Sequence, residues 1–269
     1  MTIHYELDDE HIVRITIDRP EARNSADLDH FKWLRESWER FEADPDAWVA
    51  IITGVGDAFF TGADLKTYVP AITALGKRIQ DEGLTEIDGY RLDDGTRAVL
   101  RGAKLWKPVI AAVNGFCTAG GMEMLGGVDI RVACPEAQFA VMEPKRGLFA
   151  GGGTTVRLPR QIPFPHAMEF LLCADLIPAD RAYEMGLLNR IVPREELLDV
   201  AYDYARRITA NAPLAVQATK QSVWEGLGMN LRDAYRNEAQ ISSAIFATED
   251  AREGPKAFAE KRPPRWQGK

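Results

Sequence analysis

The chain has 269 residues, of which 46% are hydrophobic, and its net charge is −7. This composition is sufficient for a sizeable buried core in one domain or two. Lysine and arginine are spread along the chain with no basic patch, so we expect no nucleic-acid partner. The first ten residues lack the basic and apolar regions of a signal peptide, and no apolar run is long enough to span a bilayer. We therefore expect a cytoplasmic protein with no membrane partner.

The cysteines and histidines give no sign of metal chemistry. Cys117, Cys134 and Cys173 are widely spaced and odd in number, which fits neither a disulfide framework nor a zinc site. The four histidines contain no pair spaced as H-x-x-x-H. Cys117 has apolar neighbours and no histidine nearby in the sequence, so we expect it to be packed in the core and not to act as a nucleophile.

The N-terminal third predicts a strand, then a helix, then a buried strand. Residues 12–18 alternate and are β-branched, and residues 5–7 are expected to pair with them. A helix follows, capped by Ser25 or Asp27, because apolar residues recur there at spacings of three and four. Residues 48–54, 108–115 and 129–133 are continuous apolar runs. Such runs separated by helices indicate an α/β fold with a parallel sheet buried on both faces.

The middle and the end of the chain differ in regularity. Residues 67–105 mix glycines, acidic pairs and short apolar turns, a pattern typical of a functional lid or mobile segment. From Pro178 onward the chain is mostly helical, with helical periodicity in 197–210, 213–227 and 231–246. We predict a core region of residues 1–200 and a helical oligomerisation region of residues 201–269.

Two glutamates twenty residues apart are the most informative chemical feature. Glu123 closes the glycine-containing run 114–123, and Glu143 precedes three consecutive glycines at 151–153. Paired carboxylates can divide general acid and general base work, and glycines let backbone N–H groups approach a substrate oxygen. The alternative from local sequence is that both glutamates are solvated and the glycines only make turns.

Four motifs in this order resemble the crotonase, or enoyl-CoA hydratase/isomerase, superfamily, and the resemblance covers essentially the whole chain. They are Arg-Pro-Glu-Ala-Arg-Asn at 19–24, Ala-Phe-Phe-Thr-Gly-Ala-Asp-Leu at 58–65, the run at 114–123, and Phe-Ala-Glu-Lys-Arg at 258–262. The resemblance implies a ClpP-like ββα-spiral core and a C-terminal α-helical trimerisation region. It also implies a coenzyme A thioester as substrate, no permanently bound cofactor, and a homotrimer or homohexamer.

The same resemblance assigns the reacting groups. The oxyanion hole would be the N–H groups of Ala63 and Gly120. Glu143 would protonate the α-carbon, Glu123 would activate the water that attacks the β-carbon, and the N–H of Gly151 would help to hold that water. The run at 119–121 is Ala-Gly-Gly where the family often has three glycines, and we expect little effect of that difference.

The remaining site residues fall into two groups. By resemblance, the coenzyme A contacts would be Ala22, Arg23, Thr61 and Leu65, with Phe258 and Lys261 reaching the nucleotide end from a neighbouring subunit. From their position after the oxyanion motif or after Glu143, the acyl pocket is expected to contain Tyr68, Val69, Ile72, Leu75, Leu148 and Phe149, with residues 76–100 as its mobile outer wall. The alternative is that Tyr68 to Leu75 only pack the core.

The leading prediction is an enoyl-CoA hydratase acting on a trans-2-enoyl-CoA in the degradation of fatty or related acyl chains. An isomerase, a thioester hydrolase, a decarboxylase or a carnitinyl-CoA dehydratase remains open, since one scaffold hosts many reactions. A noncatalytic acyl-CoA-binding or RNA-binding member is the alternative of another class. The segment 67–105 also resembles that of bacterial relatives that act on large acyl groups, such as carnitinyl or sterol side-chain thioesters.

Overall fold

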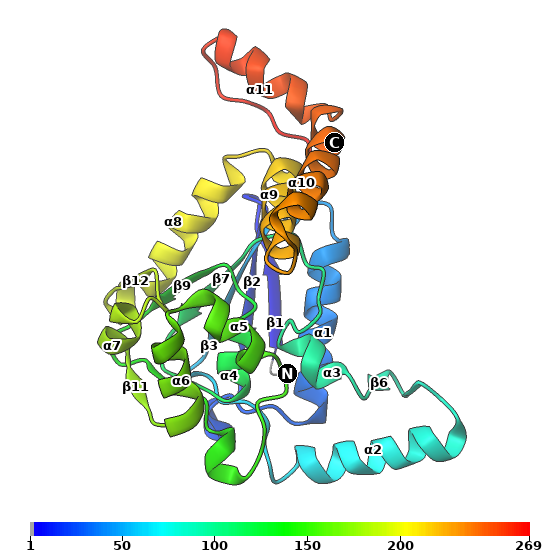
Figure 1. The fold of residues 1–269 in the computed structure, drawn as a ribbon, viewed down its shortest axis with the longest axis vertical. Helices are drawn as coiled ribbons and strands as arrows, with labels where there is room; N and C mark the ends of the chain where they lie inside the picture. Colours follow the sequence, from blue (N-terminus) through cyan, green and yellow to red (C-terminus); the bar gives the residue numbers. More distant parts are fainter. Residues whose placement is uncertain (1–2) are drawn as a thin grey trace.

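The computed structural model describes residues 3–269 and contains two main β-sheets with helices around them (Figure 1). The larger sheet has six strands in the order β1-β2-β3-β7-β9-β12, all parallel except the antiparallel pair β1 and β2. Its strands are β1 (Ile3–Leu7), β2 (Ile12–Ile17), β3 (Val49–Gly54), β7 (Val109–Val113), β9 (Ile130–Ala133) and β12 (Arg190–Ile191). The apolar runs of the sequence therefore form the buried parallel sheet that they predict.

A smaller sheet was not predicted as a separate layer. Its strand order is β11-β10-β8-β4, with β4, β8 and β10 parallel to one another. The strands are β4 (Ala58–Phe60), β8 (Phe116–Thr118), β10 (Gln138–Ala140) and β11 (Ile177–Pro178). These strands are only two or three residues long, so periodicity alone does not separate them from turns.

The chain passes repeatedly from the large sheet to the small sheet and then into a helix. β3 and β4 lead to α2 (Tyr68–Glu82) and α3 (Asp94–Ala98), and β7 and β8 lead to α4 (Gly120–Leu125). β9 and β10 lead to the 3-10 helix η2 (Glu143–Arg146) and α5 (Thr154–Gln161). Each turn thus has the strand, strand, helix order of the expected ββα spiral.

Two helices cover the opposite sides of the large sheet. The predicted first helix is α1 (Leu28–Ala43), and Asp27 is its N-cap because its side chain accepts the His30 N–H. Its apolar stripe enters the main core, which lies between the sheets. On the other face, α8 (Leu197–Thr209) buries Leu197, Ala201 and Ala205 against the strands. α6 (Phe164–Cys173), α7 (Ala179–Glu184) and the short 3-10 helices η1 (Pro20–Ala22) and η3 (Arg194–Glu196) complete the core region.

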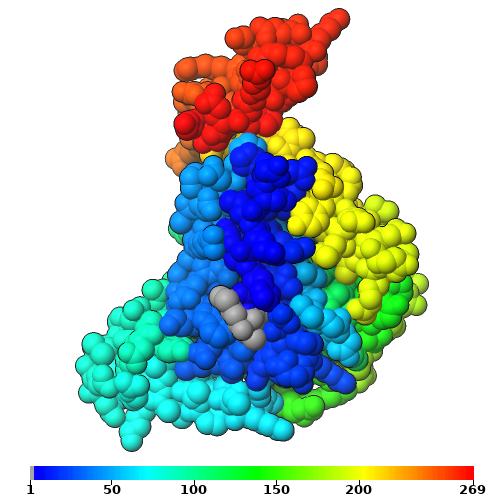
Figure 2. Space-filling model, turned by 180° about the vertical axis from the view of Figure 1, so that it is seen from behind, coloured from blue at the N-terminus to red at the C-terminus, as the bar shows by residue number. Residues whose placement is uncertain are grey.

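The last three helices form an arm. They are α9 (Pro213–Gly226), α10 (Leu231–Phe246) and α11 (Asp250–Ala259), and α10 contains no buried residue. Figures 1 and 2 show α11 standing clear of the body of the molecule. The predicted boundary between residues 200 and 201 falls within α8, which packs on the sheet. The division into a core and an oligomerisation region stays a prediction.

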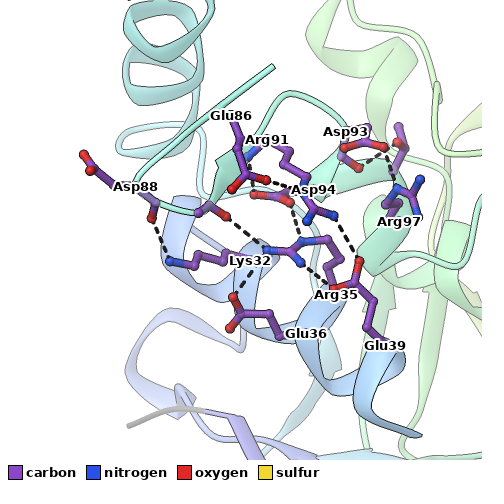
Figure 3. A network of polar contacts seen from close by, with 12 residues as sticks. Lys32, Arg35, Glu36, Glu39, Glu86, Asp88, Arg91, Asp93, Asp94 and Arg97 are labelled. Carbon is purple, nitrogen blue, oxygen red and sulfur yellow. Dashed lines mark hydrogen bonds and ion pairs between the residues drawn. The ribbon is translucent and has the colours of Figure 1, made fainter. Parts of the chain in front are cut away.

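The segment 67–105 is more ordered than its sequence suggests. It consists of α2, a hairpin of β5 (Glu86–Ile87) and β6 (Tyr90–Arg91), and α3. The buried side chains Leu75, Ile79 and Ile87 form a small core of their own. A network of ion pairs then fastens the hairpin and α3 to α1 (Figure 3).

The centre of that network is a buried ion pair between Arg35 on α1 and Asp94 on α3. Arg35 Nε lies 2.6 Å from Asp94 Oδ1, and the two side chains are 4% and 1% exposed. Arg35 also pairs with Glu39 at 2.6 Å and donates to the Gly89 carbonyl at 3.1 Å. Residues 86–98, part of the expected mobile outer wall, are therefore held in place by α1. The partners in these contacts are more than fifty residues apart in the sequence, so no local pattern predicts them.

Candidate active site

Three adjacent parallel strands of the small sheet end side by side, and the candidate residues follow them. The order of these strands is β10-β8-β4, with Ala140 opposite Thr118 and Cys117 opposite Phe60. Because carboxyl ends of parallel strands share one edge, the segments that follow them meet there. Ala63 comes after β4, Gly120 and Glu123 after β8, and Glu143 after β10.

The two predicted oxyanion donors are brought together by a close contact between glycines. A methyl group on Gly62 would lie 2.7 Å from the Gly120 nitrogen, and Gly62 has φ +86°, so glycine is required there on both grounds. The Ala26 N–H donates to the Gly62 carbonyl, and the Ala26 carbonyl accepts the Asp64 N–H, each at 2.8 Å. These two hydrogen bonds use main-chain groups of Gly62 and Asp64, the residues on either side of Ala63. The Ala63 N–H therefore points away from Ala26.

The Gly120 amide is likewise free. Gly120 is the first residue of α4, so its N–H has no carbonyl one turn earlier within the helix. Within residues 3–269 neither the Ala63 nor the Gly120 amide donates a hydrogen bond to another backbone or side-chain group. Ala119, the residue before Gly120, has φ 50° and ψ −115°, a conformation that is unfavourable for a residue with a side chain. The Ala119 methyl group therefore adds strain next to the hole, an effect that the sequence did not predict.

Glu123 lies among hydrogen-bond donors and cations. Its Oε1 accepts the N–H of Gly152, and any side chain on Gly152 would collide with the Glu123 carboxylate. Burial raises the pKa of Glu123, and the Gly152 N–H, Arg157 and Arg101 oppose that rise. The carboxylate is thus held in place by one backbone donor and faces positive charge.

Glu143 lies in a different environment. Its Oε2 is buried and has no hydrogen-bond partner among the described residues. Burial, with a smaller contribution from the charge on Glu123, raises the pKa of Glu143 to about 7. The two carboxyl groups are therefore close enough to interact, and Glu143 holds its proton to a higher pH than an ordinary glutamate does.

A groove of about 680 Å³ runs from the hole along the surface. The predicted coenzyme A contacts Ala22, Arg23, Thr61 and Leu65 line it together with Ala63. The Thr61 hydroxyl donates to the Arg23 carbonyl at 2.8 Å, and the Arg23 guanidinium lies 5.1 Å from the centre of the Phe116 ring. Lys66 and Arg146 add two further cations that the sequence reasoning missed, because nothing in their local sequence distinguishes them from solvated surface charges.

The comparisons with known proteins agree with this geometry. A sequence model of the family "Enoyl-CoA hydratase/isomerase" matches residues 8–269. The chain belongs to this enoyl-CoA hydratase/isomerase family. The protein named enoyl-CoA hydratase EchA19 of Mycobacterium tuberculosis is 40% identical over 259 residues, which cover 96% of this chain and 94% of that protein.

A second relative and a solved structure give the same result. The (E)-benzylidenesuccinyl-CoA hydratase of Thauera aromatica is 37% identical over 259 residues, or 96% of each chain. A crystal structure of an enoyl-CoA hydratase from Mycobacterium tuberculosis superposes with a TM-score of 0.85 at 38% identity and covers 99% of both chains. The predicted crotonase fold and family are therefore confirmed.

The predicted acyl-pocket residues of this family member do not all lie together. Tyr68 packs against Phe31 with ring centres 4.7 Å apart, and burial, with smaller contributions from the charges on Asp94 and Glu123, raises the pKa of its phenol. Val69, Leu148 and Phe149 are exposed. Ile72 and Leu75 pack with Ile87 in the separate cluster under the hairpin. For these last two the structure favours the alternative of a packing role.

The predicted contacts from the C-terminus lie on the arm. Phe258 is 88% exposed on α11, and Lys261 follows that helix. Figure 1 shows α11 at the opposite end of the molecule from α2, and neither residue is among those that line the groove of their own chain.

The glycine turn after Glu143 makes two contacts that the sequence did not predict. Gly151 was expected to act through its N–H. In the structure Arg101 donates to the Gly151 carbonyl at 2.6 Å, and it is the N–H of Gly152 that binds Glu123. The role of Gly151 toward a water molecule stays a prediction. No motif marks Arg101, Gly152 or Arg157, since each acts through a main-chain contact between distant segments.

Two other features complete the description of the site. Cys117 is completely buried, and burial raises the pKa of its thiol, so it packs in the core as predicted. Within the part of the chain that the structure describes, no cluster of His, Cys, Asp and Glu is arranged to hold a metal ion. None of the helices described is both long and apolar enough to cross a bilayer.

Proposed function

We propose that this family member is an enoyl-CoA hydratase, which adds water across the 2,3 double bond of a trans-2-enoyl-CoA thioester. The observation that carries the proposal is the pair of unlike carboxyl groups, Glu123 and Glu143, beside the two unpaired amides of Ala63 and Gly120. The names of the relatives from Mycobacterium tuberculosis and Thauera aromatica support a hydro-lyase.

The two amides would bind the thioester carbonyl oxygen. Attack at the β-carbon moves negative charge onto that oxygen, and two fixed donors stabilise the charge where it develops. Loss of one such donor in other enzymes costs about 3 kcal/mol of transition-state stabilisation. Coenzyme A is in this proposal part of the substrate, and the reaction uses no permanently bound cofactor.

The two glutamates would divide the proton transfers. Glu123, ionised, takes a proton from a water molecule as its oxygen bonds to the β-carbon. Glu143, protonated, delivers its proton to the α-carbon as the enolate collapses. Glu123 then releases the proton that it gained to solvent, and Glu143 takes up a new proton from solvent, so the net reaction is addition of one water. Gly151 would help to hold that water.

The groove would hold coenzyme A. Ala22 and Arg23 would lie along the pantetheine and phosphates, and Thr61 and Leu65 would flank the adenine. Arg23, Lys66 and Arg146 outnumber the acidic lining residues Glu21 and Asp64, and these three cations can pair with the phosphates. Tyr68, Val69, Leu148 and Phe149 would contact the acyl group.

The nucleotide end would be completed by Phe258 and Lys261 of a second copy. We propose a homotrimer or a homohexamer, because α10 buries no residue in the single chain and Phe258 is almost fully exposed. Light scattering at micromolar concentration tests this proposal, and a monomer would contradict it. A cytoplasmic location stays a prediction that cell fractionation can test.

A panel assay tests the reaction. Purified protein is mixed with short, long and polycyclic trans-2-enoyl-CoA thioesters, and the loss of the enoyl thioester absorbance is followed. We expect hydration of at least one of them and incorporation of ¹⁸O from labelled water at the β-carbon. An isomerase would instead convert 3-enoyl-CoA thioesters to 2-enoyl-CoA without taking up labelled oxygen, so adding 3-enoyl-CoA thioesters to the panel distinguishes the two.

A further inference from the structure

Arg157 is a largely buried cation without a carboxylate partner in the described chain. It lies on α5, where its Nη1 donates to the carbonyls of Val99 at 3.1 Å and Glu123 at 3.2 Å, and its Nη2 donates to the Leu100 carbonyl. Among residues 3–269, its hydrogen-bond acceptors are all main-chain carbonyls, and it forms no ion pair with a carboxylate. The side chain therefore connects three segments through neutral acceptors. Burial lowers the pKa of Arg157 to about 10, so the group is still a cation beside α4 at neutral pH.

Glycines make room for this side chain. A methyl group on Gly127 would lie 3.0 Å from Arg157 Nη1, and one on Gly126 would lie 3.2 Å from Arg157 Cδ. A methyl group on Gly153 would lie 3.5 Å from Arg157 Nε. The guanidinium is thus enclosed between the end of α4 and the start of α5, and its position relative to the Glu123 main chain is fixed.

Arg101 reaches Glu123 through a single peptide group. Its Nη1 donates to the Gly151 carbonyl at 2.6 Å, and the N–H of Gly152 donates to Glu123 Oε1. The carbonyl of residue 151 and the N–H of residue 152 belong to the same peptide unit. A cation on the carbonyl oxygen polarises that unit and strengthens its N–H as a donor, so the contact stabilises the ionised carboxylate.

The other titratable groups near Glu123 act against its ionisation or lie further away. Glu143 on η2 is a like charge, and Tyr68 on α2 is a neutral phenol whose pKa is raised in part by the Glu123 carboxylate. Burial also raises the pKa of Glu123. Only Arg157, Arg101 and the Gly152 N–H oppose these effects.

We infer that Arg101 and Arg157 are positioning residues that keep Glu123 ionised and aimed, and so decide which glutamate acts as the base. The inference rests on the proposed hydratase function for its kinetic consequence, but not for its geometry. Neither arginine touches the reacting atoms in this assignment. Arg157 acts through the Glu123 main chain and its charge, and Arg101 acts through the 151–152 peptide.

The test is the pH profile of kcat/KM for Arg101→Gln and Arg157→Gln. A general base works only when ionised, so its pKa sets the acidic limb, and removal of a nearby cation raises that pKa. We expect the acidic limb to move to higher pH by about one unit in each variant, which lowers kcat/KM about tenfold on that limb. Arg101→Lys and Arg157→Lys keep the charge and should restore part of the shift.

Arg160→Gln is the matched control. Arg160 lies on the same helix, is exposed, and donates only to the Val156 carbonyl of its own turn at 2.6 Å. The Arg160→Gln variant should leave the acidic limb of the pH profile at its wild-type position. A uniform loss of activity at all pH values in the two test variants, with no movement of the limb, would show a purely structural role and overturn the inference.

A second measurement separates the inference from the proposed function. Protein labelled with ¹³C in the glutamate carboxyl groups is titrated by NMR, and the Glu123 signal is assigned by its absence in Glu123→Gln. The Glu123 pKa should rise in Arg101→Gln. Because the Arg101 side chain is exposed, its loss should not prevent folding. An unchanged pKa would refute the inference even in an active hydratase, whereas a raised pKa in a protein without hydratase activity would refute only the proposed function.

Discussion

The surroundings of Glu123 and of Glu143 differ although both residues are glutamates at the same edge of the small sheet. Glu123 lies on a helix, accepts a backbone N–H and has two arginines nearby. Glu143 lies on a 3-10 helix with one buried oxygen that has no partner in the described chain. Burial raises the pKa of both carboxyl groups, but the Gly152 N–H and the two arginines oppose that rise at Glu123, so Glu123 loses its proton more readily than Glu143 does.

This difference shows how one residue type supplies two opposite functions. Chemical identity provides a carboxyl group at each position, and the local donors and burial decide whether it carries a proton at neutral pH. The interaction between the two carboxyl groups increases the difference between their pKa values, since ionisation of Glu123 makes ionisation of Glu143 harder.

The largest expected effect follows from removing either carboxyl group. Glu123→Gln and Glu143→Gln should each lower kcat for hydration by about 10²-fold or more, the scale of acid–base catalysis. The double variant should lose less than the product of the two losses, because the residues act as a unit. Turnover of an enoyl-CoA substrate from the panel measures all three.

Glu195→Gln, an exposed glutamate on η3, controls for the general effect of a lost charge and should retain full activity. Undiminished turnover in Glu123→Gln or Glu143→Gln would remove that residue from the mechanism.

A second prediction concerns the contact that distinguishes Glu123. Gly152→Ala would place a methyl group on the Glu123 carboxylate, which must then move. We expect kcat to fall by about 10²-fold, the cost of misplacing a catalytic group by about 1 Å, with a smaller change in KM. Gly228→Ala is the control, since its nearest neighbour would be 4.0 Å away. Wild-type kcat in Gly152→Ala would mean that Glu123 need not occupy its present position.

A third prediction uses the pKa of Glu143. A general acid works when protonated, so kcat/KM should fall as pH rises through about 7, by about tenfold per unit above that value. The folded-state pKa is raised above the unfolded value, so protonation stabilises the fold below the unfolded pKa, and that stabilisation is lost as pH rises toward 7.

Glu143→Gln should remove this dependence of the free energy of unfolding on pH between about 4.5 and 7, as urea denaturation at several pH values would reveal. A dependence identical to wild type would place the titration on another group.

The smallest effect on turnover is expected far from the carboxyl pair. Asp94→Asn removes the buried one of the two carboxylates that lie 2.6 Å from Arg35 and should lower the free energy of unfolding by about 3 kcal/mol. At 25 °C kcat should change less than about threefold, because the network holds the hairpin and not the glutamates.

Asp93→Asn breaks the neighbouring but exposed pair with Arg97 and should cost less than about 1 kcal/mol. Urea denaturation and a turnover assay measure both variants. A large loss of kcat in Asp94→Asn would mean that the network also positions the catalytic groups.

Much of the fold was predictable because its determinants are local. The apolar runs that became β3, β7 and β9, and the stripe that became α1, carry their own periodicity. The family motifs identified the fold, and the structure places Ala63, Gly120, Glu123 and Glu143 at one sheet edge. Asp27 was one of two expected caps, and the structure selects it.

The parts that the sequence did not predict depend on contacts between distant segments. Arg35 and Asp94 are 59 residues apart, and Arg101 and Gly151 are 50 residues apart. Nothing in the sequence near Gly152 indicates that its N–H meets the Glu123 carboxylate. The same is true of Ile72 and Leu75, whose helical spacing fits either an acyl pocket or the cluster under the hairpin that they join.

The contact between Gly62 and Gly120 has a consequence for how this scaffold can be altered. Both oxyanion donors belong to the main chain, so no side-chain replacement at Ala63 deletes an N–H unless proline is introduced. A variant with both glutamates replaced by glutamine should therefore still bind and polarise a thioester carbonyl, although it could no longer move protons. Such a protein is a starting point for installing a different pair of reactive side chains, because thioester recognition and proton transfer are encoded in separate parts of the molecule.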